Sequence, residues 1–191
     1  MRLRRSPIYG WGINDADYLV ASKTHKCKYY TVWTDMIRRC HSKKCLDKHP
    51  TYEGCSIHSD WKYFSNFKKW MEKQDWEGKF IDKDLLFPDN KVYGPDTCVF
   101  VTRQLNNLFT DHGGRGPHKQ GVYKHRGIRE KPYVAQISRY GKQTEVGYFD
   151  NEEDAHECYK KARREYLIEV ANKQKDVRLV NALMQRVELY I

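Results

Sequence analysis

IDKDLLFPDNKVYGPDTCVFVTRQLNN, residues 81–107, is the stretch that decides how the first half of this chain folds. Asp82 is followed by a polar turn that contains Asn and Pro, and the turn leads to an apolar strand at 98–101. Asn106 and Asn107 then stand where a helix is expected. A strand-turn-strand-helix unit brings a carboxylate and an amide together, and both offer the oxygen ligands that Mg²⁺ and Mn²⁺ bind. The pattern therefore predicts a divalent-metal site.

The order of these residues resembles the motif of HNH nucleases, most closely that of phage-encoded HNH homing endonucleases. That motif has a strand ending in Asp-His, a turn, a second strand entered by an Asn, and a helix that carries the last metal ligand. The resemblance implies that Asp82 and Asn106 (or Asn107) bind Mg²⁺ or Mn²⁺ and that the substrate is a DNA phosphodiester bond. YYTVWTDMIRRC (29–40) and YEGCSIHSDWKYFSNFKKW (52–70) extend the resemblance upstream.

Two positions depart from the motif. Lys83 stands where the family has its general-base His, and Thr97 stands where it has its middle Asn. A lysine whose pKa is near ~10.4 is a poor base at neutral pH. Lys83 and Asp84 are therefore expected in the site without an assigned role, and positioning of water is one hypothesis. A replacement base would come from one of three upstream histidines: His41, His49 or His58.

The chain is strongly basic, because 35 Lys and Arg against 25 Asp and Glu give a formal net charge of +10 over 191 residues. A charge of this size attracts phosphate backbones and speeds encounter with them. Aromatic residues make up 14% of the chain and are interleaved with the basic ones, which suits base stacking as well as core packing. Double-stranded DNA is therefore the expected partner, and RNA is an alternative.

No stretch approaches the ~18 apolar residues that a membrane-spanning helix needs. Residues 1–18 are basic but lack the apolar region of a secretory signal. We therefore expect no membrane partner and a cytoplasmic location, in the bacterial host if the chain is phage-encoded. In that compartment the six cysteines are expected to be thiols or metal ligands, and not disulfides.

A second metal site is considered from cysteine spacing. Cys55 and His58 have the two-residue gap of a zinc half-site, and Cys40 and Cys45 form a looser pair. Together they would make a structural Zn²⁺ site of the C/C/C/H kind. The alternative is that the cysteines are small, partly buried thiols and that His58 is a surface residue.

The remaining organisation follows from periodicity and composition. Residues 1–25 read as an extended N-terminal arm, in which Arg2, Arg4 and Arg5 either follow a phosphate backbone or have no fixed structure. A nuclease-like module is expected at 26–110, with apolar helical stripes at 29–40 and 63–71. Residues 41–51 show no secondary-structure signal. The Gly- and Pro-containing segment 111–120 has the composition of a linker.

Three strand-like runs at 121–127, 131–139 and 142–149 precede a helix at 151–171, which Asn151 or Asp150 is expected to cap. The expected fold class is α+β: a small HNH-like ββα-metal module, followed by a three-stranded antiparallel sheet packed on one helix. Residues 173–191 predict a last helix that begins near Asp176. It packs on either module or makes a dimer contact, and the oligomeric state is not predicted.

The second module resembles the plant ethylene-response-factor (ERF) type of DNA-binding domain over about residues 121–172. Its marks here are Gly121-Val122, Tyr133-Val-Ala-Gln-Ile137, Val146-Gly-Tyr-Phe149 and Glu152-Glu-Asp-Ala155. The resemblance implies that the sheet face away from the helix touches DNA.

By alternation, three residues point to the helix: Tyr133, Ala135 and Ile137. The residues expected to point outward are Val134, Gln136, Ser138, Tyr123, His125, Gln143 and Glu145. The plant domains have Arg and Trp at several of these places, so their base preference is not carried over. The predicted DNA-binding residues are Tyr123, Lys124, His125, Arg126, Arg129, Gln136, Ser138, Arg139, Lys142 and Gln143.

The expected function is a sequence-directed DNA endonuclease that nicks or cleaves with a divalent metal. The main alternative is a catalytically inactive DNA-binding protein that acts by occupancy. A basic adaptor for an acidic protein partner is a third reading.

Overall fold

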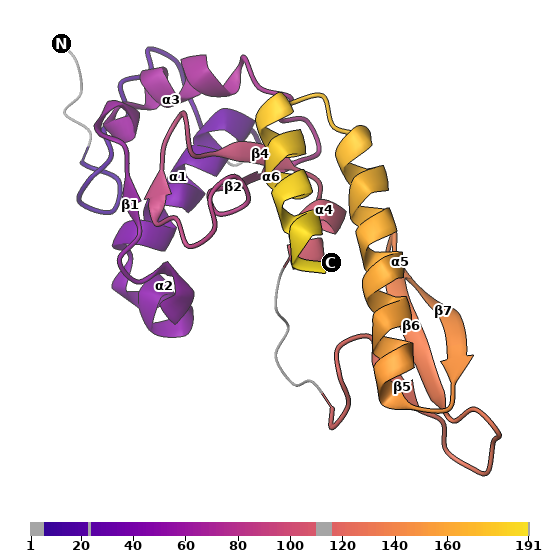
Figure 1. Ribbon diagram of the computed structural model, residues 1–191. Coiled ribbons are helices and arrows are strands. Elements are labelled where there is room, and N and C mark those ends of the chain that lie inside the picture. Colours follow the sequence, from indigo (N-terminus) through magenta and orange to yellow (C-terminus); the bar gives the residue numbers. More distant parts are fainter. Residues whose placement is uncertain (1–5, 23, 110–115, 191) are drawn as a thin grey trace. The chain divides into compact units, whose positions relative to one another are not determined.

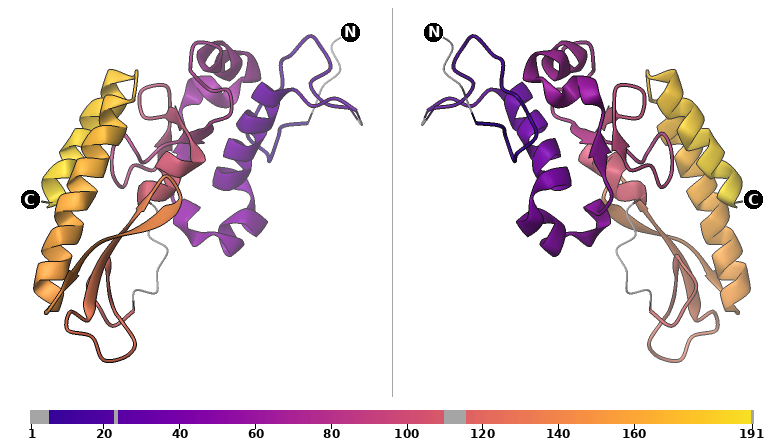
Figure 2. Two further views of the ribbon diagram at one scale, coloured as in Figure 1. Left: turned by 90° about the vertical axis from the view of Figure 1, so that its right-hand side faces the viewer. Right: turned by 90° about the vertical axis from the view of Figure 1, so that its left-hand side faces the viewer.

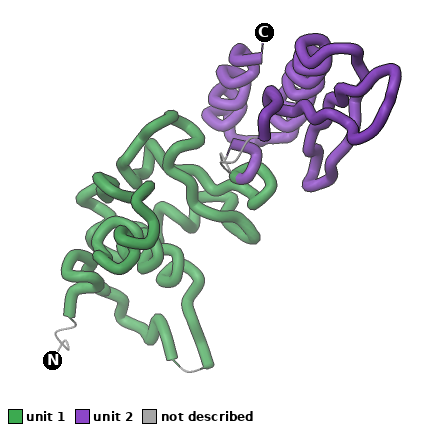
Figure 3. Tube along the Cα trace, turned by 90° about the horizontal axis from the view of Figure 1, so that it is seen from below, with its two compact units in different colours: residues 1–106 green, residues 107–191 purple. Residues whose placement is uncertain are grey.

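The computed structural model describes residues 6–22, 24–109 and 116–190. It divides into two compact units, Met1–Asn106 and Asn107–Ile191, which are coloured separately in Figure 3. Each unit is described by itself below. Figure 1 labels the helices and strands where there is room. Among the described helices, none is long and apolar enough to cross a bilayer.

Two amphipathic helices form the core of the first unit, as the apolar stripes predict. They are α1 (Lys28–His41) and α3 (Phe64–Met71), and they pack against each other. Their buried side chains are Trp33, Met36, Ile37, Cys40, Phe64, Phe67 and Met71. Burying each large side chain contributes about 1.5–3 kcal/mol. The indole N–H of Trp33 donates to the carbonyl of Trp61 at 2.7 Å, so this buried donor has a hydrogen-bond partner.

The expectation that residues 41–51 lack regular structure is wrong. This segment contains α2 (Lys43–Lys48) and a 3₁₀ turn, η1 (Pro50–Tyr52). Six residues are too few for a stable isolated helix, so tertiary packing has to hold α2 in place. Cys45, the buried residue of α2, accepts from the Arg38 guanidinium with an N–Sγ distance of 3.6 Å. This contact holds α2 against α1.

The described part of the N-terminal arm is tied to this unit. Ile13 accepts from the N–H of Phe64 at 3.1 Å and donates to the carbonyl of Lys62 at 2.8 Å. The Asp15 carboxylate accepts from the hydroxyl of Ser65 at 2.5 Å. Arg2, Arg4 and Arg5 lie outside the described residues, as do residues 111–115 of the expected linker.

Short strands connect the helices of the first unit. β1 (Ser56–Ile57) pairs in parallel with β3 (Val92–Tyr93), and β2 (Phe80–Asp82) pairs antiparallel with β4 (Val99–Val101). Helix α4 (Arg103–Phe109) follows β4 directly. From β2 to α4 the chain runs through strand, loop, strand and helix, but β3 lies between β2 and β4 and pairs with β1. A 3₁₀ turn, η2 (Ser59–Lys62), precedes α3.

The second unit is a three-stranded antiparallel sheet packed on one helix, as expected. The strand order is β5 (Val122–Lys124), β6 (Tyr133–Arg139), β7 (Lys142–Phe149), and α5 (Glu152–Asn172) follows. Figure 2 shows α5 along one face of the sheet. Asn151 caps α5 by accepting from the N–H of Asp154 at 2.9 Å. The face between sheet and helix buries Ala135, Ile137, Ala155, Tyr159, Ala162 and Tyr166.

The last helix, α6 (Val177–Val187), packs on α5 and so belongs to the second unit. Asp176 caps it by accepting from the N–H of Arg178 at 2.9 Å. Its buried residues are Leu179, Ala182, Leu183 and Val187. A 3₁₀ turn, η3 (Glu188–Tyr190), ends the described chain. Of the two alternatives drawn from sequence, packing on a module is the one observed.

Candidate functional site

Asp82, the predicted metal ligand, ends β2 and lies opposite Val99 in the register with β4. Its Oδ1 accepts hydrogen bonds from the backbone N–H of Asp84 at 2.9 Å and of Leu85 at 2.7 Å. Burial nevertheless raises the pKa of this carboxyl above its usual value, because desolvation outweighs those two bonds. Asp82 is therefore a fixed carboxylate whose charge its surroundings disfavour, which is the condition that a bound cation relieves.

Lys83, which the sequence sets at the general-base position of an HNH-like motif, is buried within the first unit. Its side chain is 6% exposed. The ammonium donates to the Asp84 carboxylate and to the carbonyl of Asn90 at 2.9 Å, and it lies 5.9 Å from the Tyr93 ring centroid. An amine that donates to two oxygen acceptors is not placed to take a proton from water. The geometry thus gives Lys83 and Asp84 a structural role, and it does not support the hypothesis that either one positions water.

Asn90 is a site residue that the sequence analysis did not single out. Its amide donates to the carbonyls of Lys83 and Val92, both at 2.8 Å, and its oxygen accepts from the N–H of Val92 at 3.2 Å. It therefore closes the loop between β2 and β3. The only sequence signal for this role is an Asn in a turn-rich segment, a place where Asn commonly bonds to the backbone.

Thr97 also serves the backbone. Its hydroxyl contacts the carbonyl of Val92 at 2.7 Å and that of Gly94 at 3.4 Å, so it holds the turn that leads from β3 to β4. No direct chemical role for Thr97 follows from these contacts. It is a positioning residue for the strand that faces Asp82.

The two predicted amide ligands are separated by the division into units. Asn106 lies on α4, within the first unit, and its N–H donates to the carbonyl of Thr102 at 3.0 Å. Asn107 is the first residue of the second unit. Asp82 lies opposite Val99, the first residue of β4. Helix α4 begins two residues after β4 ends. Both residues lie on α4, and Asn106 stays the ligand candidate that the sequence favours.

Of the three histidines considered as replacement bases, His58 lies beside the turn that leads into β4. Its N–H donates to the carbonyl of Tyr93 at 2.8 Å. A Cβ built on Gly94 would lie 3.5 Å from the His58 Cβ and 3.4 Å from the Thr97 hydroxyl, so His58 and Thr97 flank the same glycine. The His58 side chain is 44% exposed, which leaves its ring accessible to water.

The other two histidines are occupied elsewhere. His41 stacks on Trp11 with ring centroids 5.3 Å apart, and burial lowers its pKa. His49 contacts the edge of Tyr52. Neither ring is placed by these contacts near Asp82.

The hypothesis of a zinc site gains no support. Over 6–22, 24–109 and 116–190, no group of three or more His, Cys, Asp or Glu side chains is placed to hold a metal. Cys40, Cys45 and Cys55 are buried. Burial raises the pKa of the Cys40 thiol to about 12, which opposes the thiolate that zinc requires. His58 turns Nδ1 to the N–H of Asp60 at 3.3 Å.

The outer face of the second unit's sheet carries five of the ten predicted DNA-binding side chains: Tyr123, His125, Gln136, Ser138 and Gln143. The cross-strand register places Tyr123, Val134 and Tyr148 in one row, and Gln136 beside Glu145. Ser138 and Gln143 form the next outward pair. Tyr123 also lies 6.0 Å from the His125 ring, so these two share the face as expected.

The outer face is not exposed along its whole length. Val134 points away from α5, as expected, yet it is completely buried. The reason lies in its neighbours: Tyr123 and Tyr148 flank it, and both hydroxyls donate to the carboxylate of Glu145. The three polar side chains form a lid over Val134. We call Tyr123, Glu145 and Tyr148 the tyrosine–glutamate clamp.

The predicted phosphate anchors divide into two groups. Arg126, Arg129 and Lys142 are exposed at the ends of strands or in the loop between them. Lys124 is exposed as well, with its ammonium 5.2 Å from the ring centroid of Tyr133.

Arg139 does not fit the expectation. It donates to the carbonyl of Ala162 at 3.3 Å and lies over the ring of Tyr166, both on α5. Strand alternation places it on the helix side of the sheet, so it fastens β6 to α5 and is not available to a duplex on the outer face.

No protein-family model matches the chain, and no curated protein or solved structure matches it. The HNH and ERF resemblances therefore stay predictions, and the functional argument rests on the side-chain geometry of the two units.

Proposed function

We propose that this protein is a sequence-directed, DNA-binding endonuclease of the HNH type that nicks double-stranded DNA with Mg²⁺ or Mn²⁺. The second unit supplies a sheet face for the duplex, and the first unit supplies the metal site. The observation that carries the proposal is Asp82, a carboxylate fixed by two backbone N–H groups where burial disfavours its charge. Asp82 and Asn106 are the residues that would hold the metal.

A divalent metal at this position would stabilise the charge that develops on a phosphate during hydrolysis. Lys83 is engaged with Asp84 and Asn90, so a different group has to accept the proton of the attacking water. His58 is the candidate, because it is accessible and flanks the turn that leads into β4. Histidine suits the task, since its ordinary pKa lies near ~6.5.

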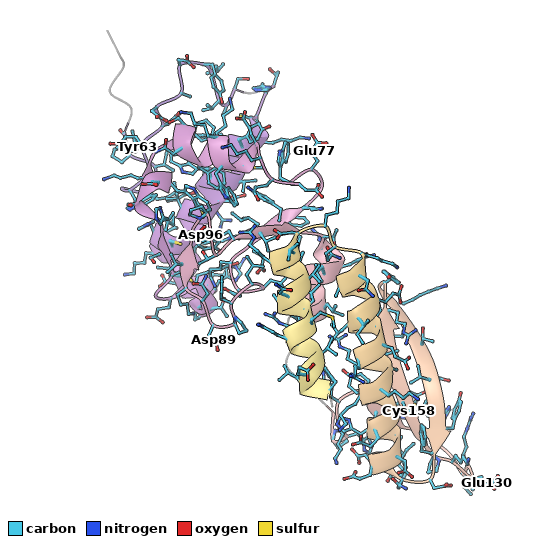
Figure 4. All side chains as sticks on the ribbon, turned by 45° about the horizontal axis from the view of Figure 1, so that its top comes forward. Tyr63, Glu77, Asp89, Asp96, Glu130 and Cys158 are labelled. Atoms are coloured by element: carbon cyan, nitrogen blue, oxygen red, sulfur yellow. The ribbon has the colours of Figure 1, made fainter. Side chains whose placement is uncertain are left out.

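The test is the conversion of supercoiled plasmid to open circle by the full chain, with Mg²⁺, with Mn²⁺ and with EDTA. We compare Asp82→Asn, which keeps an oxygen for the two N–H donors, with Asp96→Asn as a matched control. Asp96 is exposed in the same unit and is labelled in Figure 4. Metal-dependent nicking that is lost in Asp82→Asn and kept in Asp96→Asn is the expected result.

A second candidate function is a DNA-binding protein that has lost catalysis and acts by occupancy. The burial and pairing of Lys83 favour it, because the position of the family's base carries no base here. A plasmid that is shifted on a gel but never nicked under any metal would establish this candidate instead. Binding that does not weaken with salt would count against both candidates, since phosphate contacts release counterions.

A further inference from the structure

The tyrosine–glutamate clamp places a negative charge on the outer sheet face, where Glu145 lies opposite Gln136 of the central strand. Tyr123 comes from β5, whereas Glu145 and Tyr148 come from β7, and these two strands are separated by β6. One tyrosine hydroxyl donates to each oxygen of the Glu145 carboxylate. The group thus bridges the whole width of the sheet above Val134.

A bulge in β7 makes this arrangement possible. Glu145 and Tyr148 are three residues apart, and strict alternation would put them on opposite faces. The register moves from Ala135 opposite Gly147 to Gln136 opposite Glu145, so Val146 is an extra residue on β7. Bulges of this kind re-aim side chains. Here the bulge brings Glu145 to the same face as Tyr148.

The surroundings of the carboxylate are basic. Its charge interacts favourably with His125 and Arg129, and the tyrosine hydrogen bonds are the main reason that the pKa of Glu145 lies below its usual value. Within the part of the chain that the structure describes, no cation forms an ion pair with it. The carboxylate is therefore ionised and held still, with its charge open to a ligand.

A fixed carboxylate has a limited set of partners on DNA. It accepts hydrogen bonds only, and with roughly four acceptor sites in all it keeps about one on each oxygen after both tyrosines have donated. Phosphate repels it. The hydrogen-bond donors in the major groove are the amino groups of cytosine and adenine, and adenine sets an acceptor, N7, beside its donor. A carboxylate consequently fits cytosine better.

We propose that Glu145, held by Tyr123 and Tyr148, is a specificity-determining residue that accepts a hydrogen bond from the amino group of a cytosine in the major groove. This inference rests on the proposed binding of duplex DNA by the second unit. The tyrosines are positioning residues, because they fix the carboxylate before the duplex arrives and so reduce the entropy lost on binding.

The experiment is selection of bound duplexes from a randomised library by the full chain at fixed salt, followed by affinity measurements on single-base variants. The variants are Glu145→Gln, the double variant Tyr123→Phe with Tyr148→Phe, and Glu130→Gln. Glu130 is exposed in the loop between β5 and β6 (Figure 4), so its substitution removes the same charge outside the clamp. Thermal melting of each variant establishes that it is folded.

For the wild type and Glu130→Gln we expect one position of the selected site to be cytosine, with other bases bound about 5- to 150-fold more weakly, the range of one good base contact. Glu145→Gln is expected to lose that preference or move it to adenine, which glutamine reads better. The double Tyr→Phe variant is expected to keep cytosine with a smaller ratio.

An unchanged selected sequence in Glu145→Gln, with the variant folded and binding, would overturn the inference and leave DNA binding intact. So would salt-dependent binding by the wild type without any base preference. Failure of the wild type to bind any duplex at low salt would overturn the proposed function itself, and the inference with it.

Discussion

Replacing Gly121 by alanine tests how tightly the sheet of the second unit is joined to α5. Gly121 precedes β5 and has φ +76°, in the left-handed region that L residues avoid. A Cβ at this position would lie 2.0 Å from Cδ2 of Tyr159 and 2.2 Å from its Cγ. Carbon atoms in contact normally lie about 3.5–4.0 Å apart. The ring therefore has to move by roughly 1.5 Å or the strand has to leave the helix.

The expected cost has two parts. The left-handed backbone costs alanine about 1–2 kcal/mol, and overpacking of a filled core costs about 1–3 kcal/mol more. Tyr159 is 5% exposed and stacks on His156, so its ring has little room to turn away. Gly141 separates the two parts, because it has φ +78° and no atom within 4 Å of its virtual Cβ. Gly141→Ala should show the backbone cost alone.

The measurement is urea unfolding of the full chain for both variants, monitored by circular dichroism. We expect Gly121→Ala to lower the free energy of unfolding of the second unit by about 2–5 kcal/mol and Gly141→Ala by about 1–2 kcal/mol. In a melt, each kcal/mol corresponds to about 4–8 °C for a unit of this size. Equal losses in the two variants would refute the argument that Tyr159 packs against the backbone at Gly121.

Three further predictions concern single side chains. Burial raises the pKa of Asp82, so ionisation of this carboxyl destabilises the fold as pH rises through its folded-state pKa. Asp82→Asn removes that ionisation. It should therefore raise Tm at pH 7 and give no gain at pH 3. Arg129→Ala should reduce the salt dependence of DNA binding by about one counterion, whereas Arg139→Ala should lower stability with the salt slope unchanged. Burial raises the pKa of Cys98 to about 12, so iodoacetamide at pH 8 should label it far more slowly than half-buried Cys27.

Periodic segments are the parts of the fold that the sequence predicts well. α1 and α5 each present an apolar stripe over several turns, and the strands of the second unit are set apart by turn residues. Local signals also place the caps at Asn151 and Asp176. In these segments the residues that decide the structure lie within one or two turns of each other, so their pattern is visible without knowledge of the fold.

The candidate sites depend on contacts that periodicity does not reveal. From the sequence, Lys83 is a residue of unassigned role at a catalytic position. Its structural role depends on the hydrogen bond from its ammonium to the carbonyl of Asn90, seven residues away, which the sequence does not reveal. The clamp depends on one extra residue in β7, Val146. Because of this bulge, the residues of β7 before Val146 point to the opposite face from the one that alternation from Tyr148 would give. Arg139 was assigned to DNA for its charge alone, although alternation from Ile137 already places it towards α5.

Asp82 and Lys83 are adjacent, yet the fold accounts for only one of them. Lys83 has its charge matched by Asp84 and its donors used by the loop, so it is fully explained as part of the first unit's interior. Asp82 also bonds to the loop, but an asparagine oxygen would accept the same two N–H groups without the cost of a desolvated charge. Burial alone therefore favours a neutral group such as an amide at this position, and a bound cation would stabilise the carboxylate. For this reason the case for a metal site rests on Asp82. We expect Asp82→Asn to gain stability in a thermal melt and to lose nicking in the plasmid assay, and both effects would follow from removal of the same buried charge.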